Sequence, residues 1–231
     1  MSMANAKQGF PGFPPAALQF LRGLARHNDR DWFEQRKSVY LENVKAPLIE
    51  LVEALNDEFE TLAPQFRMDP KKSIYRIYRD VRFSPNKQPY KTNVAAIFHD
   101  SRLPKHSGAG FYLQFSPKQF FVGGGVYMPE SKHLLAIRRA IETDPDQLRD
   151  VLRNRTWKRY YGELRGDQLK RIPKGFSPED PAADLLVYKQ FLAMSEMDPK
   201  LVETPKMLPE VVKRFRALEP FIDFLNRPLT S

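Results

Sequence analysis

The sequence predicts an α+β fold in which an antiparallel sheet is flanked by N-terminal, central and C-terminal helices. Apolar residues recur at helical spacing as far as Leu62, alternate with polar ones from Ile74 to Met128, and return to helical spacing from Pro129. Strands gathered between two groups of helices are typical of this class. No repeat, low-complexity segment or linker interrupts the 231 residues. We therefore expect a single domain over 1–231, with 1–12 as a flexible lead-in.

Three helices are predicted before the sheet. The first opens at Pro14-Pro15, because proline suits the first turn of a helix. Asn28-Asp29 ends that helix and provides an N-cap for a second one that begins near Asp31. The third runs from about Ala46 to Leu62 and is ended by Pro64.

Four stretches with a period of two are predicted to be strands: Ile74–Phe83, Val94–His99, Gly110–Ser116 and Gln119–Met128. The last two form a hairpin, in which Pro117 occupies the position that a type I turn favours.

Helices return after the hairpin. One begins at about Pro129 and another covers 145–155, whereas 160–205 is expected to be irregular, with short strands and turns. A final helix starts at Pro209 and bends near Pro220.

Composition excludes several classes of protein. The chain has no cysteine, which rules out disulfides, thiol nucleophiles and thiolate metal sites. The four histidines show no metal-ligand spacing, so neither a metal nor another cofactor is expected. No stretch approaches the length of an apolar membrane span, and the first residues lack the apolar run of a signal peptide. We expect a cytoplasmic protein with no membrane partner.

The net charge of +9 is concentrated in about a quarter of the chain. Residues 66–120 hold 11 Lys/Arg and 3 Asp/Glu, a balance of +8, whereas 1–65 has a balance of −2 and 121–231 a balance of +3. A local excess of this kind indicates a basic face or pocket, and therefore an anionic partner.

Residues 76–91 carry most of this excess, with five cations, one carboxylate and three aromatic residues in sixteen positions. Arginine suits planar or phosphate oxyanions, lysine adds point charge and a tyrosine hydroxyl donates one more hydrogen bond. The predicted ligand-binding residues are Arg76, Arg79, Asp80, Arg82, Asn86, Lys87, Tyr90 and Lys91.

Asp80 is expected to be held by arginine in either regular conformation. In a strand it lies about 7 Å from Arg82 on the same face, and in a helix it stacks with Arg76. Both neighbours favour the ionised carboxylate and lower its pKa. Asp80 is therefore a poor general base but is suited to orienting an arginine.

Three hypotheses about function follow. The first is a site for a small anionic or phosphorylated molecule, with the motif's side chains converging in a concavity near Gly123–Gly125. The second is a nucleic-acid-binding protein that uses the basic segment as an exposed face. The third is a structural role, with the motif as a buried ion-pair network that neutralises carboxylates such as Glu34 or Glu58. The sequence indicates no reaction, and whether the protein is an enzyme is left open.

Other features are weaker signals. Gly123–Gly125 fits no nucleotide-binding fingerprint and favours close packing of backbones. Aromatic residues could stack on bases, but most of them, including Phe83 and Tyr112, are interpreted as core. Tyr78 and Tyr90 are the exceptions, because cations flank them.

The basic motif also resembles the signature of a bacterial family catalogued as domain of unknown function 2461. The resemblance rests on Arg76-x-x-Arg79-Asp80-x-Arg82-Phe83 followed by Asn86-Lys87-x-x-Tyr90. It extends to further positions along nearly the whole chain: Phe13, 28–33, 89–92, 123–125, Pro129, 173–176, 184–186 and Lys189. The resemblance implies that the motif defines the family and favours a site there, and it implies no activity.

Overall fold

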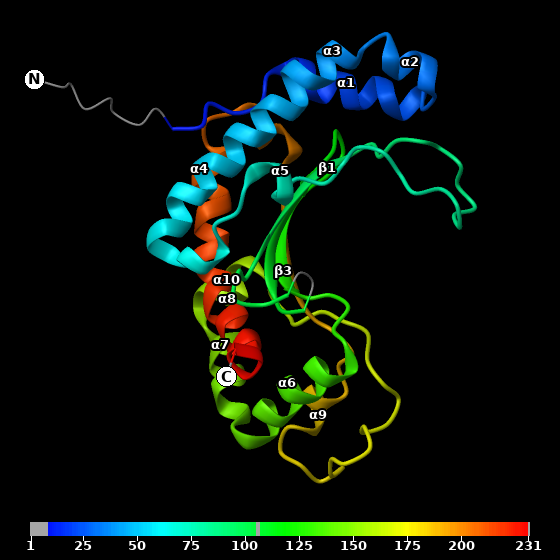
Figure 1. The fold of residues 1–231 in the computed structure, drawn as a ribbon. Helices are drawn as coiled ribbons and strands as arrows, with labels where there is room; N and C mark the ends of the chain where they lie inside the picture. The colour runs from blue at the N-terminus through cyan, green and yellow to red at the C-terminus, as the bar shows by residue number, and fades with distance from the viewer. Residues whose placement is uncertain (1–8, 105–106, 231) are drawn as a thin grey trace, which may run out of the picture.

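A four-stranded antiparallel sheet lies against helices in this computed structural model, which describes residues 9–104 and 107–230 (Figure 1). The strands are β1 (Val94–His99), β2 (Gly110–Phe115), β3 (Phe120–Val126) and β4 (Phe191–Met197). The α-helices are α1 (Pro15–Arg26), α2 (Arg30–Glu34), α3 (Lys37–Tyr40), α4 (Ala46–Leu62), α5 (Pro70–Ser73), α6 (Ser131–Thr143), α7 (Pro145–Arg153), α8 (Arg155–Tyr160), α9 (Ala183–Leu186) and α10 (Met207–Thr230). A π-helical turn, η1 (Leu41–Lys45), and two 3-10 turns, η2 (Pro64–Phe66) and η3 (Pro199–Glu203), complete the elements. The predicted α+β class is confirmed.

The strands follow one another in the order β1-β2-β3-β4, and each pair is antiparallel. The predicted hairpin joins β2 to β3, and the backbone amide of Ser116 donates to the carbonyl of Gln119 at 2.7 Å. One register row crosses the whole sheet: Ile97, Tyr112, Gly123 and Met194.

One face of the sheet packs on α4 and α10. Phe98 and Phe111 lie 5.0 and 5.1 Å from Phe59 of α4, measured between ring centroids. Phe111 also lies 4.9 Å from Phe215 of α10. Because alternate residues of a strand point to opposite faces, Ile97 and the other members of its row point away from these helices. Figure 1 shows α4 and α10 along this same side of the sheet.

Two expectations for the strands were wrong. The stretch predicted as the strand Ile74–Phe83 pairs with β1 only at Ile74, opposite Ala96, and then leaves the sheet to pair with residues further along its own segment. The stretch 160–205, predicted to be irregular, contains the seven-residue strand β4. Its inward positions include Ala193 and Ser195, which are small or polar, so its hydrophobic alternation is weak.

The N-terminal helices also differ from the prediction. The second helix is confirmed but spans only Arg30–Glu34, where the side chain of Asp29 accepts a hydrogen bond from the backbone amide of Trp32. Helical backbone then resumes at Lys37 and continues through η1 into α4, so no new helix begins at Ala46. Residues 1–8 of the expected lead-in lie outside the described residues. Phe10 is 5% exposed, so this end of the lead-in is packed against the core.

Candidate functional site

The basic motif forms a projecting loop, here called the basic arm (residues 77–91). Its two ends pair as a short antiparallel stem, in which Arg79 N donates to Pro89 O and Lys91 N donates to Ile77 O, both at 2.8 Å. Figure 1 shows the arm extending away from the sheet beyond the end of β1. The motif is therefore neither a sheet strand nor a helix.

The stem is anchored on the N-terminal helices. Asn28 bonds both backbone groups of Tyr90, accepting from its amide at 3.0 Å and donating to its carbonyl at 3.1 Å. The ring of Tyr90 stacks on Phe33 at 4.2 Å between centroids, and only 3% of Tyr90 is exposed. Tyr90, predicted as a ligand-binding residue, lies at the anchor of the arm instead of on its surface.

An ion pair lies at the beginning of the tip. Arg82 holds Asp80 through two side-chain hydrogen bonds, Nε to Oδ1 at 3.0 Å and Nη2 to Oδ2 at 2.7 Å. These bonds lower the pKa of Asp80 to about 2, as the sequence predicted in direction. The side chains of Asp80 and Arg82 are 44% and 76% exposed. Since Glu34 and Glu58 pair with cations outside the motif, Lys37 and Arg216, the motif does not form the buried ion-pair network of the third hypothesis.

Further hydrogen bonds shape the tip. Asn86 accepts from the backbone amide two residues later at 2.9 Å, and Lys87 Nζ donates to the carbonyl of Val81 at 3.1 Å. Arg79 donates to the hydroxyl of Ser84 at 3.4 Å. These contacts are local, so they order the tip while leaving Asn86 and Lys87 exposed.

Phe83 stands at this tip with 93% of its surface exposed. The guanidinium of Arg82 lies 5.8 Å from its ring centroid. The interpretation of Phe83 as a core residue was wrong, because no other segment within 9–104 and 107–230 packs over the tip to bury it.

Arg76 and Lys91 lie at the root of the arm, where the charge of Arg76 acts on Lys91. Lys91 Nζ lies 5.0 Å above the ring of Tyr75. Burial, and then the positive charge of Arg76, lower the pKa of Lys91. Two like charges are thus held near each other beside an aromatic ring.

From this root an aromatic row continues onto the open face, meaning the side of the sheet turned away from α4 and α10. Tyr75 makes an edge contact with Tyr112 at 6.1 Å, and Tyr112 lies 6.1 Å from Phe121 on the next strand. Tyr112 and Phe121 are partly exposed, and Tyr75 is 38% exposed. The hydroxyl of Tyr112 lies 2.7 Å from Gln114 Oε1, to which it donates, while partial burial raises the pKa of this tyrosine to about 12.

The three glycines of β3 allow close backbone packing. A Cβ placed on Gly123 would come within 2.2 Å of the carbonyl oxygen of Ala193, and one on Gly125 within 2.0 Å of that of Phe191. These distances support the packing interpretation made from the sequence. Because Gly123 is the register partner of Tyr112, it also leaves the tyrosine without a side chain opposite it on the open face.

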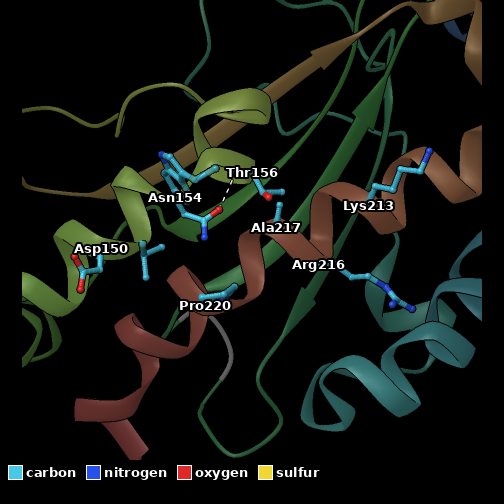
Figure 2. A pocket seen from close by; sticks show the side chains of 9 residues that line it. Asp150, Asn154, Thr156, Lys213, Arg216, Ala217 and Pro220 are labelled. Carbon is cyan, nitrogen blue, oxygen red and sulfur yellow. Dashed lines mark hydrogen bonds between the residues drawn. The ribbon is translucent and has the colours of Figure 1, made fainter.

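The eight predicted residues do not gather in one concavity. Arg76 and Lys91 lie at the root of the arm, Arg82 and Lys87 lie at its tip, and Tyr90 is buried beneath it. Two cavities are found elsewhere, on either side of α7 and α8, and no motif residue lines them. Figure 2 shows the one beside α10. In the described ranges, no group of three histidine or acidic residues is placed to hold a metal ion.

Sequence reasoning missed the aromatic row. Tyr112 and Phe121 alternate with the core residues Phe111 and Val122, so strand periodicity alone assigns them to the opposite face. That signal was available. The contribution of Tyr75 was not, because it depends on the chain leaving the sheet after Ile74.

Within the described ranges no helix has the length and apolar character needed to cross a membrane.

Comparison with known proteins places the chain in a family. Among curated proteins, none matches the chain. The family of conserved hypothetical proteins with domain of unknown function 2461 matches residues 16–224. Since this match covers most of the 231 residues, the chain belongs to that family.

Proposed function

We propose that the protein binds single-stranded nucleic acid, with bases on the open face and phosphates along the basic arm. One observation carries the proposal: at Lys91 and Tyr75, an exposed series of cations adjoins a row of partly exposed aromatic rings. Proteins that bind single strands combine these two features, since cations track the backbone while aromatic rings stack on bases.

The distribution of charge favours an extended anion. Arg76 and Lys91 lie at the root of the arm, and Arg82 and Lys87 lie at the tip. A small anion would require these groups to converge on one point, as the first hypothesis expected. A phosphate backbone instead meets its cations one after another, and each phosphate that is neutralised adds to affinity by releasing counterions.

The aromatic row favours a single strand over a duplex. Tyr75, Tyr112 and Phe121 present ring surface on or beside the sheet. In a duplex the bases are stacked on one another and their faces are inaccessible, whereas unpaired bases can lie on protein aromatic rings.

A small anionic or phosphorylated molecule is the second candidate. It is favoured by the two like charges of Arg76 and Lys91 at the root of the arm, where burial and then the charge of Arg76 lower the pKa of Lys91. Such a ligand would occupy only the root of the arm. It would leave the tip and the aromatic row unused.

Fluorescence anisotropy tests the choice. Labelled RNA and DNA strands of about 12 nucleotides are titrated with protein between about 50 and 200 mM salt, beside a duplex of the same sequence. We expect the single strands to bind more tightly than the duplex, with affinity that falls as salt rises. The variant Arg76→Gln/Lys87→Gln is expected to reduce the slope of log K against log salt by about 0.7 for each phosphate that it no longer neutralises.

The matched control is Lys213→Gln/Arg216→Gln, which removes two positive charges from α10 on the helical side of the sheet. It is expected to bind like the wild type. If the two variants weaken strand binding equally, binding depends only on the net charge of the protein, and the proposal is overturned. If no strand binds, and phosphate or pyrophosphate raises the Tm of the wild type but not of Arg76→Gln/Lys87→Gln, the small-ligand candidate replaces it.

A further inference from the structure

We propose that the cavity between α7–α8 and the segment 162–188, here called the α7–α9 cavity, binds a small amphipathic anion. The ligand class is an apolar group that carries one carboxylate, sulfonate or phosphate. The cavity has a volume of about 520 Å³, within the size range of small-molecule sites. It is separate from the basic arm and the open face.

The cavity contains apolar surface for the body of such a ligand. Four apolar residues line it: Leu152 of α7, Leu164 in the segment after α8, Leu185 of α9, and Val187. Leu185 is buried and the other three are partly buried, so their remaining exposed surface lies in a hollow. Covering this surface with an apolar group is favourable in proportion to the area removed from water.

Cations line the same cavity, and one of them is held rigidly. Arg149 bonds Asp184 through Nη2 to Oδ1 at 2.6 Å and Nη1 to Oδ2 at 3.2 Å, and it donates to the carbonyl of Pro181 at 2.8 Å. Asp184 is thereby occupied and does not compensate the remaining cations. Glu163 is the other carboxylate among the lining residues.

Arg153 and Lys158 are the remaining cations. Within 9–104 and 107–230, neither side chain makes an ion pair or a hydrogen bond. They lie five positions apart across the junction of α7 and α8, where the side chain of Asn154 caps the second helix by accepting from the backbone amide of Thr156. Two unpaired cations beside apolar surface match an anion with an apolar body.

A buried arginine adds to the positive field. Arg138 of α6 is 8% exposed and donates Nη2 to the carbonyl of Tyr188, a residue that lines the cavity, at 2.8 Å. Its Nε is buried without a hydrogen-bond partner, and no described carboxylate pairs with it. A buried cation without a counter-charge favours an anion nearby.

The other cavity provides a contrast. It is lined by Lys213 and Arg216 of α10 and has a similar volume of about 470 Å³. There, Lys213 pairs with Glu210 at 2.7 Å and Arg216 with Glu58 at 3.2 Å. Figure 2 shows the side chain of Lys213 lying over α10 and that of Arg216 extending away from this helix. Its cations are therefore already compensated, unlike Arg153 and Lys158 of the α7–α9 cavity.

The test uses 8-anilinonaphthalene-1-sulfonate, a fluorescent amphipathic anion, with the full-length protein. We expect saturable binding with a rise in fluorescence. Arg153→Gln/Lys158→Gln should weaken it by about tenfold or more, as removal of charged hydrogen bonds typically does. Octanoate should displace the probe, whereas neutral octanol at the same concentration should not, because only the carboxylate engages the cations.

The control variant Lys213→Gln/Arg216→Gln alters the other cavity and should leave probe binding unchanged. Arg153 and Lys158 are exposed, so their substitution is expected to leave the Tm within a few degrees of the wild type. Wild-type probe binding by a folded Arg153→Gln/Lys158→Gln variant would overturn the proposal. Equal competition by octanol and octanoate would also overturn it. So would loss of probe binding in Arg76→Gln/Lys87→Gln, because the probe would then bind at the basic arm.

Discussion

Asp80 and Asp100 each hold the arginine two residues later in nearly the same geometry. In the first pair, Nε donates to Oδ1 at 3.0 Å and Nη2 to Oδ2 at 2.7 Å. In the second, with Arg102, the distances are 2.9 and 2.6 Å. The Asp80 side chain is 44% exposed, however, whereas that of Asp100 is 0% exposed. The same local arrangement of an aspartate and an arginine, here called a fork, is thus accessible on the arm at Asp80. At Asp100 its carboxylate is instead part of the core beside α10.

The surroundings of Asp100 explain its role. Asn226 of α10, itself 1% exposed, donates to Asp100 Oδ2 at 3.4 Å. It also bonds both backbone groups of Ala109, accepting from the amide at 2.7 Å and donating to the carbonyl at 3.0 Å. Asp100 and Asn226 therefore connect the helix to the segment between β1 and β2.

The largest effect is expected from Asp100→Ala. Removing a buried carboxylate leaves Arg102 without its partner and removes one hydrogen bond of Asn226. Such changes commonly cost about 3 kcal/mol or more. Because the Arg102 side chain is half exposed and can hydrate, we expect the unfolding free energy to fall by about 2–3 kcal/mol, measured by urea denaturation. The matched variant Asp80→Ala should leave the denaturation midpoint nearly unchanged. Equal midpoint shifts would show that burial does not distinguish the two forks.

Asn226→Ala should follow in size. The substitution leaves the amide and carbonyl of Ala109 unpaired in a buried position, for which about 2 kcal/mol of destabilisation is typical. Urea denaturation gives the total effect, and hydrogen exchange should show faster exchange around residue 109 than around the arm. Unchanged exchange near Ala109 would contradict the proposed role of Asn226 as a connector.

Asp80→Asn tests the exposed fork through binding. On the proposal that the arm contacts phosphates, removing this negative charge should tighten oligonucleotide binding by a few-fold at low salt, with less effect at high salt. The difference from the wild type should stay constant from neutral pH down to about pH 4, since the pKa of Asp80 lies at about 2. Anisotropy titrations at several pH values measure this difference. Weaker binding by the variant would mean that the carboxylate orients Arg82 and that this outweighs its repulsion of phosphate.

The lowered pKa of Asp80 also determines the direction in which stability changes with pH. Asp80 stabilises the folded state above its unfolded pKa, and this contribution disappears as pH falls through about 2.

Phe83→Ser should have the smallest effect on stability. With 93% of its surface exposed, Phe83 contributes little burial, so the Tm should stay within a degree or two. If Phe83 stacks on a base, affinity for a single strand should fall by a few-fold while the salt slope is unchanged. Weaker affinity accompanied by a changed slope would point to displaced cations instead of missing stacking.

Local features were predictable because they depend on neighbours along the chain. The hairpin around Pro117 and the N-cap at Asn28-Asp29 follow from short-range preferences. So does the Asp80–Arg82 pair, whose members are two residues apart and whose lowered pKa was expected. By contrast, β4 carries Ala193 and Ser195 on its inward face and becomes a strand through pairing with β3.

The features of the candidate site also divide into those set by neighbouring residues and those set by the fold. Its residue types, its charge and the presence of an oriented arginine are properties of a short segment, and they follow from the order of the amino acids. Exposure does not. Tyr90 is buried because Asn28 and Phe33, about sixty positions earlier, pack against it. Phe83 is exposed because no distant segment of the described structure reaches the tip. Burial depends on contacts between residues far apart in the chain, so only the folded molecule separates a buried anchor from an exposed surface within one motif.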